Sequence, residues 1–220
     1  DSAAQEAPAV NTCNEAVVTQ EKVGTHSSSS MEPTALSTAS ATIQIISHSN
    51  EKLRIQAIES LLRIADKTIS YAFVSAMKDE SFRVRLGALR GLYKFAGELA
   101  TEYLIKALND IHPDVRRRSL IYLGWMRKKE LIPYVTSALA DDSSRVRRVA
   151  TYALSDIKDP SAVPYLMKAL DDGDQEVVKG AIAALQRITG ESFSSEQQEQ
   201  EAAQKEVVEH YKGWWLKQNK

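Results

Sequence analysis

Residues 141–154 read "DDSSRVRRVATYAL" and residues 79–92 read "DESFRVRLGALRGL", two stretches with one pattern. Each opens on an acidic pair, continues through Val-Arg and ends on a leucine four residues after an alanine. The stretches lie two steps of 31 residues apart, and a period of this size is typical of folds built from one repeated supersecondary unit.

The 31-residue step holds in five columns of the sequence. Two columns carry a leucine and a small residue four positions before it: Leu61, Leu92, Leu123, Leu154 and Leu185, with Ala57, Ala88, Ser119, Ala150 and Ala181. The other three carry an alanine, an apolar residue and an aspartate: Ala76, Ala107, Ala138 and Ala169, then Met77, Leu108, Leu139 and Leu170, then Asp79, Asp110, Asp141 and Asp172. Five columns in register establish a genuine repeat.

Each unit contains two apolar stripes with helical spacing. The first stripe, of about four turns, consists of Val146, Ala150, Leu154 and Ile157. After the turn "KDPS" (158–161), a shorter stripe follows with Val163, Leu166, Ala169 and Leu170. Pro164 is tolerated in the first turn of that second helix. Because one helical hairpin cannot bury its apolar face alone, neighbouring units must stack. The sequence therefore predicts an all-α solenoid of antiparallel helical hairpins.

The unit resembles the HEAT repeats, and specifically their short subtype first described in phycobiliprotein lyases, whose units read roughly D-x-x-x-x-V-R-x-x-A-x-x-A-L. The resemblance covers about residues 49–190. It implies a right-handed, armadillo-like superhelix. It also implies a ladder along the stack between each loop aspartate and the arginine six residues later: Asp79 with Arg85, Asp110 with Arg116, and Asp141 with Arg147.

In this ladder we expect each aspartate to accept hydrogen bonds from the backbone N–H groups that open the longer helix, and each arginine to bridge to neighbouring loops. We expect the ladder to break at both ends. His48 stands where the partner of Arg54 would be, and Val178 stands where an arginine would follow Asp172.

The chain divides into four segments. Residues 1–30 lack periodicity and predict a flexible tail, and residues 31–48 predict a capping helix with Leu36, Ala39, Ile43 and Ile46 on one face. Residues 49–190 form the repeat array. Residues 191–220 predict a C-terminal capping helix, whose helically spaced apolar residues are Val207, Val208, Tyr211, Trp214 and Trp215. We expect the two tryptophans to close that end of the stack.

Composition narrows the functional classes. The formal net charge of -1 gives no global attraction to nucleic acid or acidic membranes. Cys13 is the single cysteine, which excludes an intramolecular disulfide and a multi-cysteine metal site. No run of about 18 apolar residues occurs, so we expect a soluble protein. The start at Asp1 fits removal of an export signal or a trimmed chain, so cytoplasmic and periplasmic locations both remain open.

No catalytic, cofactor or metal site is predicted. The four histidines lie in different units or tails without cysteine partners, and the glycines inside the longer helices follow no phosphate-binding pattern. The acidic pairs Asp141/Asp142 and Asp171/Asp172 recur with the repeat, which favours helix capping over acid–base chemistry. We therefore expect a protein that is not an enzyme, has no cofactor and takes no small-molecule ligand.

Two surfaces remain as candidate partner sites. In HEAT-type stacks the shorter helices line the concave groove, and on that face this chain carries Tyr103, Tyr134 and Tyr165 with Lys106 and Lys168. Tyrosines suit partner binding because they offer a large rigid area and one hydroxyl. The alternative is that each ring packs between adjacent shorter helices.

The second candidate lies on the longer helices around "DVRRRSLIYLGW" (114–125). Trp125 shares its column with four charged residues, Arg63, Lys94, Asp156 and Arg187. Arg117, Ile121 and Trp125 follow spacings of four, with Arg118 beside them and with Arg148 and Tyr152 on the next unit. Such a basic and aromatic patch favours contact with an acidic protein surface, unless the N-terminal tail or the C-terminal helix folds back over it.

The leading interpretation is a non-catalytic protein-binding scaffold or adaptor. A nucleic-acid-binding module is the first alternative, because residues 111–148 hold nine Lys and Arg against four Asp and Glu. That excess is modest for phosphate-driven binding, and the arginines project from the longer helices, away from the expected groove. The second alternative, a non-catalytic subunit of an enzyme resembling the bilin lyases, rests on the repeat alone.

Overall fold

The computed structural model describes residues 44, 47–64, 69–192 and 200–219. These residues form α-helices and short 3₁₀-helices, and the described part of the chain contains no strand. The expected tail (1–30) and most of the expected N-terminal capping helix (31–48) lie outside the described residues. No helix among those described is long and apolar enough to cross a membrane.

Long and short helices alternate along the chain. The long helices start 31 residues apart, and they are α2 (Glu51–Ile64), α4 (Phe82–Phe95), α6 (Pro113–Met126), α8 (Ser144–Ile157) and α10 (Gln175–Thr189). The short helices between them are α3 (Ser70–Ala76), α5 (Leu99–Ala107), α7 (Ile132–Ser137) and α9 (Val163–Ala169). Three 3₁₀ turns flank α7 and α9: η2 (Lys129–Leu131), η3 (Ala138–Ala140) and η4 (Pro160–Ala162).

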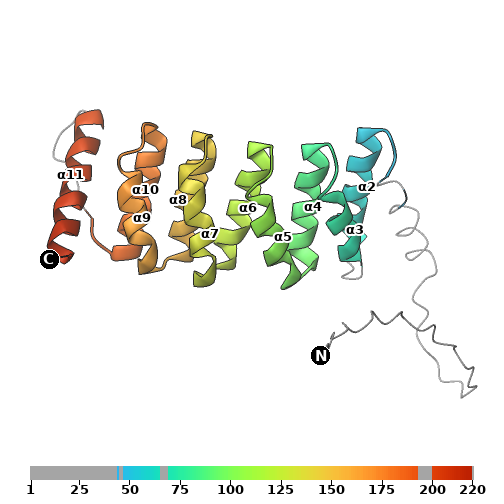
Figure 1. Ribbon diagram of the computed structural model, residues 1–220, viewed down its shortest axis with the longest axis horizontal. Coiled ribbons are helices and arrows are strands. Elements are labelled where there is room, and N and C mark those ends of the chain that lie inside the picture. Colours follow the sequence, from blue (N-terminus) through green and yellow to red (C-terminus); the bar gives the residue numbers. More distant parts are fainter. Residues whose placement is uncertain (1–43, 45–46, 65–68, 193–199, 220) are drawn as a thin grey trace, which may run out of the picture. The chain divides into compact units, whose positions relative to one another are not determined.

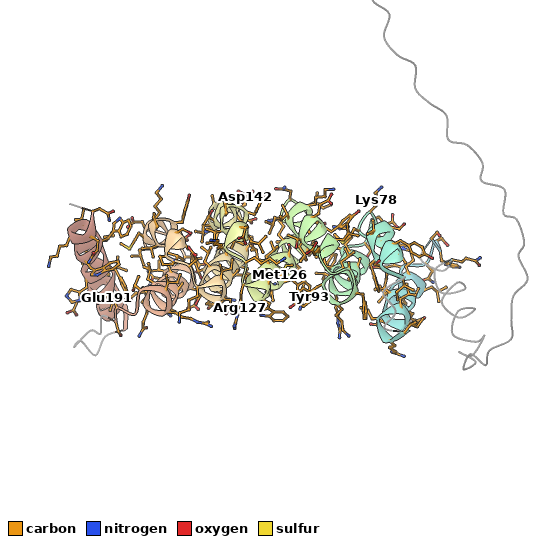
Figure 2. The ribbon with its side chains drawn as sticks, turned by 90° about the horizontal axis from the view of Figure 1, so that it is seen from below. Lys78, Tyr93, Met126, Arg127, Asp142 and Glu191 are labelled. Atoms are coloured by element: carbon orange, nitrogen blue, oxygen red, sulfur yellow. The ribbon has the colours of Figure 1, made fainter. Side chains whose placement is uncertain are left out.

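Each long helix packs against the next long helix and against the short helices beside it. Figure 1 shows the long helices side by side in one row and the short helices in a second row. In Figure 2, Lys78 and Asp142, in loops that precede long helices, lie at one edge of the stack, and Arg127 and Glu191, which follow long helices, lie at the other. This arrangement confirms the predicted all-α solenoid of helical hairpins.

The repeat columns form the core of the stack. The leucine of every unit, from Leu61 to Leu185, is fully buried, and the small-residue column from Ala57 to Ala181 lies beside it. Some contacts need a residue smaller than alanine. A Cβ on Gly124 of α6 would lie 2.8 Å from the Ala153 Cα of α8, and one on Gly91 of α4 would overlap the Phe73 ring of α3. The glycines therefore let neighbouring helices approach closely.

The arginine–aspartate ladder joins neighbouring units. Arg85 donates from Nε and Nη2 to the two carboxylate oxygens of Asp110, each at 2.7 Å. Its Nη1 donates to the carbonyls of Asp79 at 2.8 Å and Glu80 at 3.0 Å. Three further rungs repeat the ion pair: Arg54 with Asp79, Arg116 with Asp141, and Arg147 with Asp172. Each rung thus fastens the start of one long helix to the loop before the next.

The structure corrects two details of the expected ladder. Each carboxylate pairs with the arginine of the preceding unit, 25 residues earlier, while the aspartate six residues before the arginine contributes its carbonyl oxygen. The ladder also does not break at Arg54 or Asp172. Arg54 needs no aspartate before it because the carbonyls of His48 and Ser49 accept its Nη1 hydrogens at 3.0 Å each. Asp172 receives Arg147 whatever follows it.

The ladder aspartates also organise the helix starts, as their sequence positions suggest. Oδ1 of Asp141 accepts the backbone N–H of Ser143 at 2.9 Å, and Oδ1 of Asp172 accepts that of Asp174 at 2.8 Å. Ser143 and Asp174 are the residues that precede the first turns of α8 and α10. The paired carboxylates that could have suggested acid–base chemistry are therefore engaged in structural contacts at Asp141 and Asp172.

Helix α11 (Gln200–Gln218) packs against α10. Val207, Val208 and Tyr211 are buried, and the Tyr211 hydroxyl donates to the Glu191 carbonyl at 2.8 Å. Trp214 and Trp215 are partly buried and pack against the same core. The helix therefore covers apolar surface at this end of the repeats, where the sequence places the C-terminal cap.

Candidate functional site

A hollow of about 550 Å³ lies on the long helices. We call it the long-helix groove. It is lined by residues of α2, α4 and α6: Ile55, Ile58, Glu59, Leu62, Arg83, Leu86, Gly87, Arg90, Tyr93, Lys94, Arg118, Tyr122 and Trp125. The α2 side is largely apolar, whereas the α4 and α6 sides combine basic and aromatic groups. The groove is therefore chemically graded from one end to the other.

Three aromatic rings form one wall of this groove. Tyr93 of α4 and Tyr122 of α6 stack with ring centroids 4.4 Å apart and planes 10° apart. Trp125 meets both rings, with centroids at 6.0 Å from Tyr93 and 5.7 Å from Tyr122. Tyr122 is only 5% exposed, but Trp125 remains 53% exposed. Trp125 is thus the solvent-facing edge of a supported aromatic cluster, a geometry suited to receiving an apolar group.

Tyr93 and Tyr122 were missed by the sequence argument, although their columns carried a signal. The Tyr122 column otherwise holds the small residues Ser60, Gly91, Ala153 and Ala184. Tyr93 stands one 31-residue step before Gly124. The large ring in a small-residue column fills space between α4 and α6 that other units leave to the helices themselves. Burial raises the pKa of the Tyr122 hydroxyl, which therefore stays neutral at physiological pH.

Basic side chains surround the aromatic wall. The Arg118 guanidinium lies 6.0 Å from the Tyr122 ring centroid, within cation–π range. Among the described residues, Arg90, Lys94 and Arg118 form no ion pair, and Arg83 has only a 3.6 Å contact with Glu51. Glu59 is the one acidic side chain that lines the groove. The groove therefore carries an excess of positive charge.

The arginine triplet of 116–118 divides into three separate roles. Arg116 is a rung of the ladder with Asp141, and Arg117 donates to the Asp114 carboxylate at 2.5 Å on its own helix. Arg118 alone reaches the long-helix groove. The charge excess counted over residues 111–148 is therefore largely compensated within the fold.

The rest of the patch predicted on the long helices is only partly assembled. Ile121 is half-buried against the core, and Arg148 lies 3.7 Å from Glu176. Tyr152 is 46% exposed on α8 but does not line the groove. The predicted patch thus contributes Trp125 and Arg118 to the site. The C-terminal helix does not cover Trp125, since it packs on α10, and the N-terminal tail lies outside the described residues.

The tyrosines of the short helices do not line this groove. Tyr134 on α7 and Tyr165 on α9 are 46% and 44% exposed, so neither ring is enclosed between neighbouring helices. Tyr103 on α5 is half-buried, with the Lys106 ammonium 5.3 Å from its ring centroid. Lys106 also binds Glu102, and Lys168 is exposed. The expectation that the groove lies on the short helices needs correction, because the hollow faces the long ones.

The described residues offer no group of three His, Cys, Asp or Glu side chains that could hold a metal ion. The site thus consists of aromatic surface and cations, which are groups that bind a partner and need no bound metal to do so.

These features define an α-solenoid with one open basic and aromatic groove. A family model for HEAT repeats matches residues 39–112 and 101–186. The chain therefore belongs to the HEAT-repeat family. No curated protein sequence matches the chain.

Several solved structures share this fold. One is a chain of the complex of CpcE and CpcF of phycocyanin lyase from Nostoc sp. PCC7120, with 19% identity, a TM-score of 0.56, and coverage of 79% of this chain and 71% of that one. Another is a designed armadillo repeat protein in complex with the peptide (KR)4, with 20% identity, a TM-score of 0.51, and coverage of 79% and 87%. A third is an engineered protein with 17% identity, a TM-score of 0.52, and coverage of 80% and 96%. At these identities the likeness concerns the fold alone.

Proposed function

We propose that this protein is a non-catalytic scaffold that binds a partner protein through the long-helix groove. The observation that carries the proposal is Trp125, a half-exposed indole held against Tyr93 and Tyr122 beside three cations that form no ion pair among the described residues. HEAT-type and armadillo-type repeats commonly mediate protein interactions. A conformationally fixed aromatic edge loses little side-chain entropy on binding, which is the behaviour of a binding hot spot.

The size of the exposed indole supports a measurable contribution. A tryptophan side chain can bury up to about 250 Å², so the exposed half of Trp125 offers roughly 130 Å². At about 25 cal/mol per Å², covering it would contribute about 3 kcal/mol. This amount corresponds to about a hundredfold in affinity. Loss of this one side chain should therefore be visible in a binding measurement.

The face formed by the short helices provides an internal comparison. Tyr165 is exposed to nearly the same extent as Trp125, but it stands on α9 and does not line the groove. A substitution of Tyr165 therefore tests whether any exposed aromatic residue would serve. It also tests the alternative that the tyrosines of the short helices are the partner site.

The experiment combines covalent capture with affinity measurement. The photo-crosslinking residue p-benzoylphenylalanine replaces Glu59 in the groove or Lys168 on the short helices, and the full chain is irradiated in native extract. The captured protein is then purified and titrated against the wild-type chain and against Trp125→Asp and Tyr165→Asp variants with unchanged helicity. We expect capture at position 59, an affinity lowered at least about tenfold by Trp125→Asp, and no change with Tyr165→Asp. The reverse ranking of the two variants, or equal affinities for all three chains, would overturn the proposal.

A second candidate function has one specific observation in its favour. The groove combines guanidinium groups with flat aromatic rings, the chemistry that a planar tetrapyrrole with propionate groups would require. We also propose that the repeats belong to the short subtype of the phycobiliprotein lyases, as the Asp and Val-Arg spacing supports, with a role as a non-catalytic subunit. Titration of a bilin into the full chain tests this candidate by absorbance. A saturable spectral shift that Arg118→Glu removes would support it, and an unchanged spectrum would exclude it.

A further inference from the structure

We infer that the long-helix groove takes an extended acidic segment of a partner protein, which places an apolar side chain on the α2 side and carboxylates on the α4 and α6 sides. This inference rests on the proposed function and specifies the chemistry of the partner. The juxtaposition that carries it is Arg90 and Lys94 of α4 with Arg118 of α6, around the exposed edge of Trp125.

The charges of the lining residues set the sign of the partner. Four cations line the groove against the single carboxylate of Glu59. Further along the stack, the equivalents of Lys94 are Asp156 and Arg187, which neutralise each other at 3.1 Å. The repeat thus pairs this column on α8 and α10 but leaves Lys94 without an ion-pair partner among the described residues. Carboxylates of a bound segment would supply the missing counter-charges and would also speed encounter.

The apolar side of the groove sets a second requirement. Ile55 and Leu62 of α2 and Leu86 of α4 are half-buried groove residues with apolar surface still open to solvent. A leucine-sized side chain of the partner would cover that surface. The α2 side has Glu59 as its charged group, so a carboxylate placed there would be repelled.

The spacing of these groups follows from the helix packing. Packed helices lie about 8–10 Å apart, and an extended chain advances about 3.3–3.6 Å per residue. A segment that crosses α2, α4 and α6 therefore advances about three residues per helix. The partner pattern is then an apolar residue, two residues of any kind, an acidic residue, two residues of any kind and a second acidic residue.

The aromatic wall disfavours nucleic acid as the occupant. Single-stranded nucleic acids bind by stacking bases on open ring faces. Here Tyr93 and Tyr122 stack on each other at 4.4 Å, and Tyr122 is almost fully buried. The wall therefore presents chiefly the edge of Trp125, to which an aliphatic side chain or a backbone segment can pack. The designed armadillo protein in complex with (KR)4 shows that a solenoid of this fold can hold an extended charged peptide, in that case a basic one.

The test uses the full chain and fluorescein-labelled peptides of about 12 residues in anisotropy titrations. One peptide carries Leu-x-x-Glu-x-x-Glu, a second has glutamine for both glutamates, a third has lysine, and a fourth is a scramble of the first. A single-stranded oligonucleotide is the fifth probe. We expect the first peptide to bind at least about tenfold more tightly than the others, with an affinity that falls as salt rises from about 50 to about 200 mM.

Charge-reversed variants locate the binding. Arg90→Glu with Arg118→Glu should weaken the glutamate peptide at least about tenfold and strengthen the lysine peptide. Glu59→Gln removes the one repulsive carboxylate and should tighten the glutamate peptide about twofold. Lys168→Glu is the matched control, because it reverses an exposed cation on α9 and should change nothing. All of these residues are exposed, so each variant is expected to keep the helicity of the wild-type chain.

Each contrary result has a distinct meaning. Equal binding of the glutamine and glutamate peptides, absence of binding by all peptides, or equal loss in Lys168→Glu overturns the acidic-segment inference. Tighter binding of the oligonucleotide than of the glutamate peptide overturns it in favour of nucleic acid. In these cases the proposed function still stands if the captured partner depends on Trp125, whereas independence from Trp125 removes the proposed function itself.

Discussion

Arg85 holds both carboxylate oxygens of Asp110 at 2.7 Å, across 25 residues of sequence and from one helical unit to the next. The pair is almost completely buried, with 7% of the arginine side chain and 10% of the aspartate side chain exposed. Two backbone carbonyls, of Asp79 and Glu80, satisfy Nη1 of the same guanidinium. The rung is therefore a specific connection between repeats.

Removing the arginine of this rung should destabilise the stack strongly. Arg85→Leu would leave the Asp110 carboxylate buried without its partner, at a cost of about 3 kcal/mol in the free energy of unfolding. Urea unfolding followed by circular dichroism measures the change. The matched control is Arg90→Leu on the same helix, where the exposed side chain should matter by less than about 0.5 kcal/mol. Similar values for the two variants would show that the rung contributes little.

The ladder also predicts how stability depends on pH. At Asp141, burial acts to raise the pKa, but hydrogen bonds from Arg116 and the Ser143 N–H and the charge of Arg147 outweigh it and leave the pKa lowered. At Asp172 the Arg147 hydrogen bond lowers the pKa, against burial. A carboxyl with a lowered folded-state pKa stabilises the fold above its unfolded-state pKa of about 3.9. That stabilisation should be lost as the pH falls through the lower folded-state values.

Urea unfolding at several pH values checks this dependence. We expect no contribution from these two groups to a change between about pH 5 and pH 7, and a fall in the free energy of unfolding below about pH 4. Asp172→Asn should be less stable at neutral pH and should show a smaller fall on acidification. Asp142→Asn, at an exposed carboxyl of a ladder loop, should retain the wild-type fall. An unchanged acid dependence in Asp172→Asn would contradict this account.

Gly124→Ala should destabilise the contact between α6 and α8. The added Cβ would lie 2.8 Å from the Ala153 Cα, a backbone atom that cannot rotate away. Alanine favours a helix by about 1 kcal/mol over glycine, yet the displacement should leave a net loss of about 1–3 kcal/mol. Thermal unfolding measures it, with Gly173→Ala as the control because nothing lies within 4 Å of its added Cβ. A net stabilisation by Gly124→Ala would mean that α8 shifts at little cost.

Tyr211 should anchor helix α11 mainly by burial of its ring. The residue is 1% exposed, and its hydroxyl donates to the Glu191 carbonyl at 2.8 Å. Tyr211→Ala should cost about 3–5 kcal/mol, whereas Tyr211→Phe keeps the ring and should cost about 1 kcal/mol. Thermal unfolding of both variants separates the two contributions. Equal losses would instead assign the anchoring to the hydroxyl.

Much of the fold could be read from the sequence because the repeat reports on every unit at once. The 31-residue step predicted where each long helix begins, and the structure places those starts at Glu51, Phe82, Pro113, Ser144 and Gln175. The period also predicted a fully buried leucine column. A burial requirement that recurs in each unit leaves the same residue at the same position, so one-dimensional spacing is sufficient evidence.

The site was only partly predictable. Trp125 stood out as an apolar residue in a charged column, but its support by Tyr93 and Tyr122 arises between helices 31 residues apart. The expected groove on the short helices was wrong for a related reason. Which face of a stack is hollow depends on how far each unit rotates against the next and on the side chains that fill the space between them.

The sequence by itself thus determined the repeat, the helices, the buried columns and the residue types of the ladder. Only the tertiary structure decided that Arg85 pairs with Asp110 and that Arg118, alone of its triplet, joins Trp125 in the groove. The physical reason is that helix formation and burial depend on periodicity within a unit. Ion pairs and grooves depend on distances between units, which are set by close packing of side chains of unequal size.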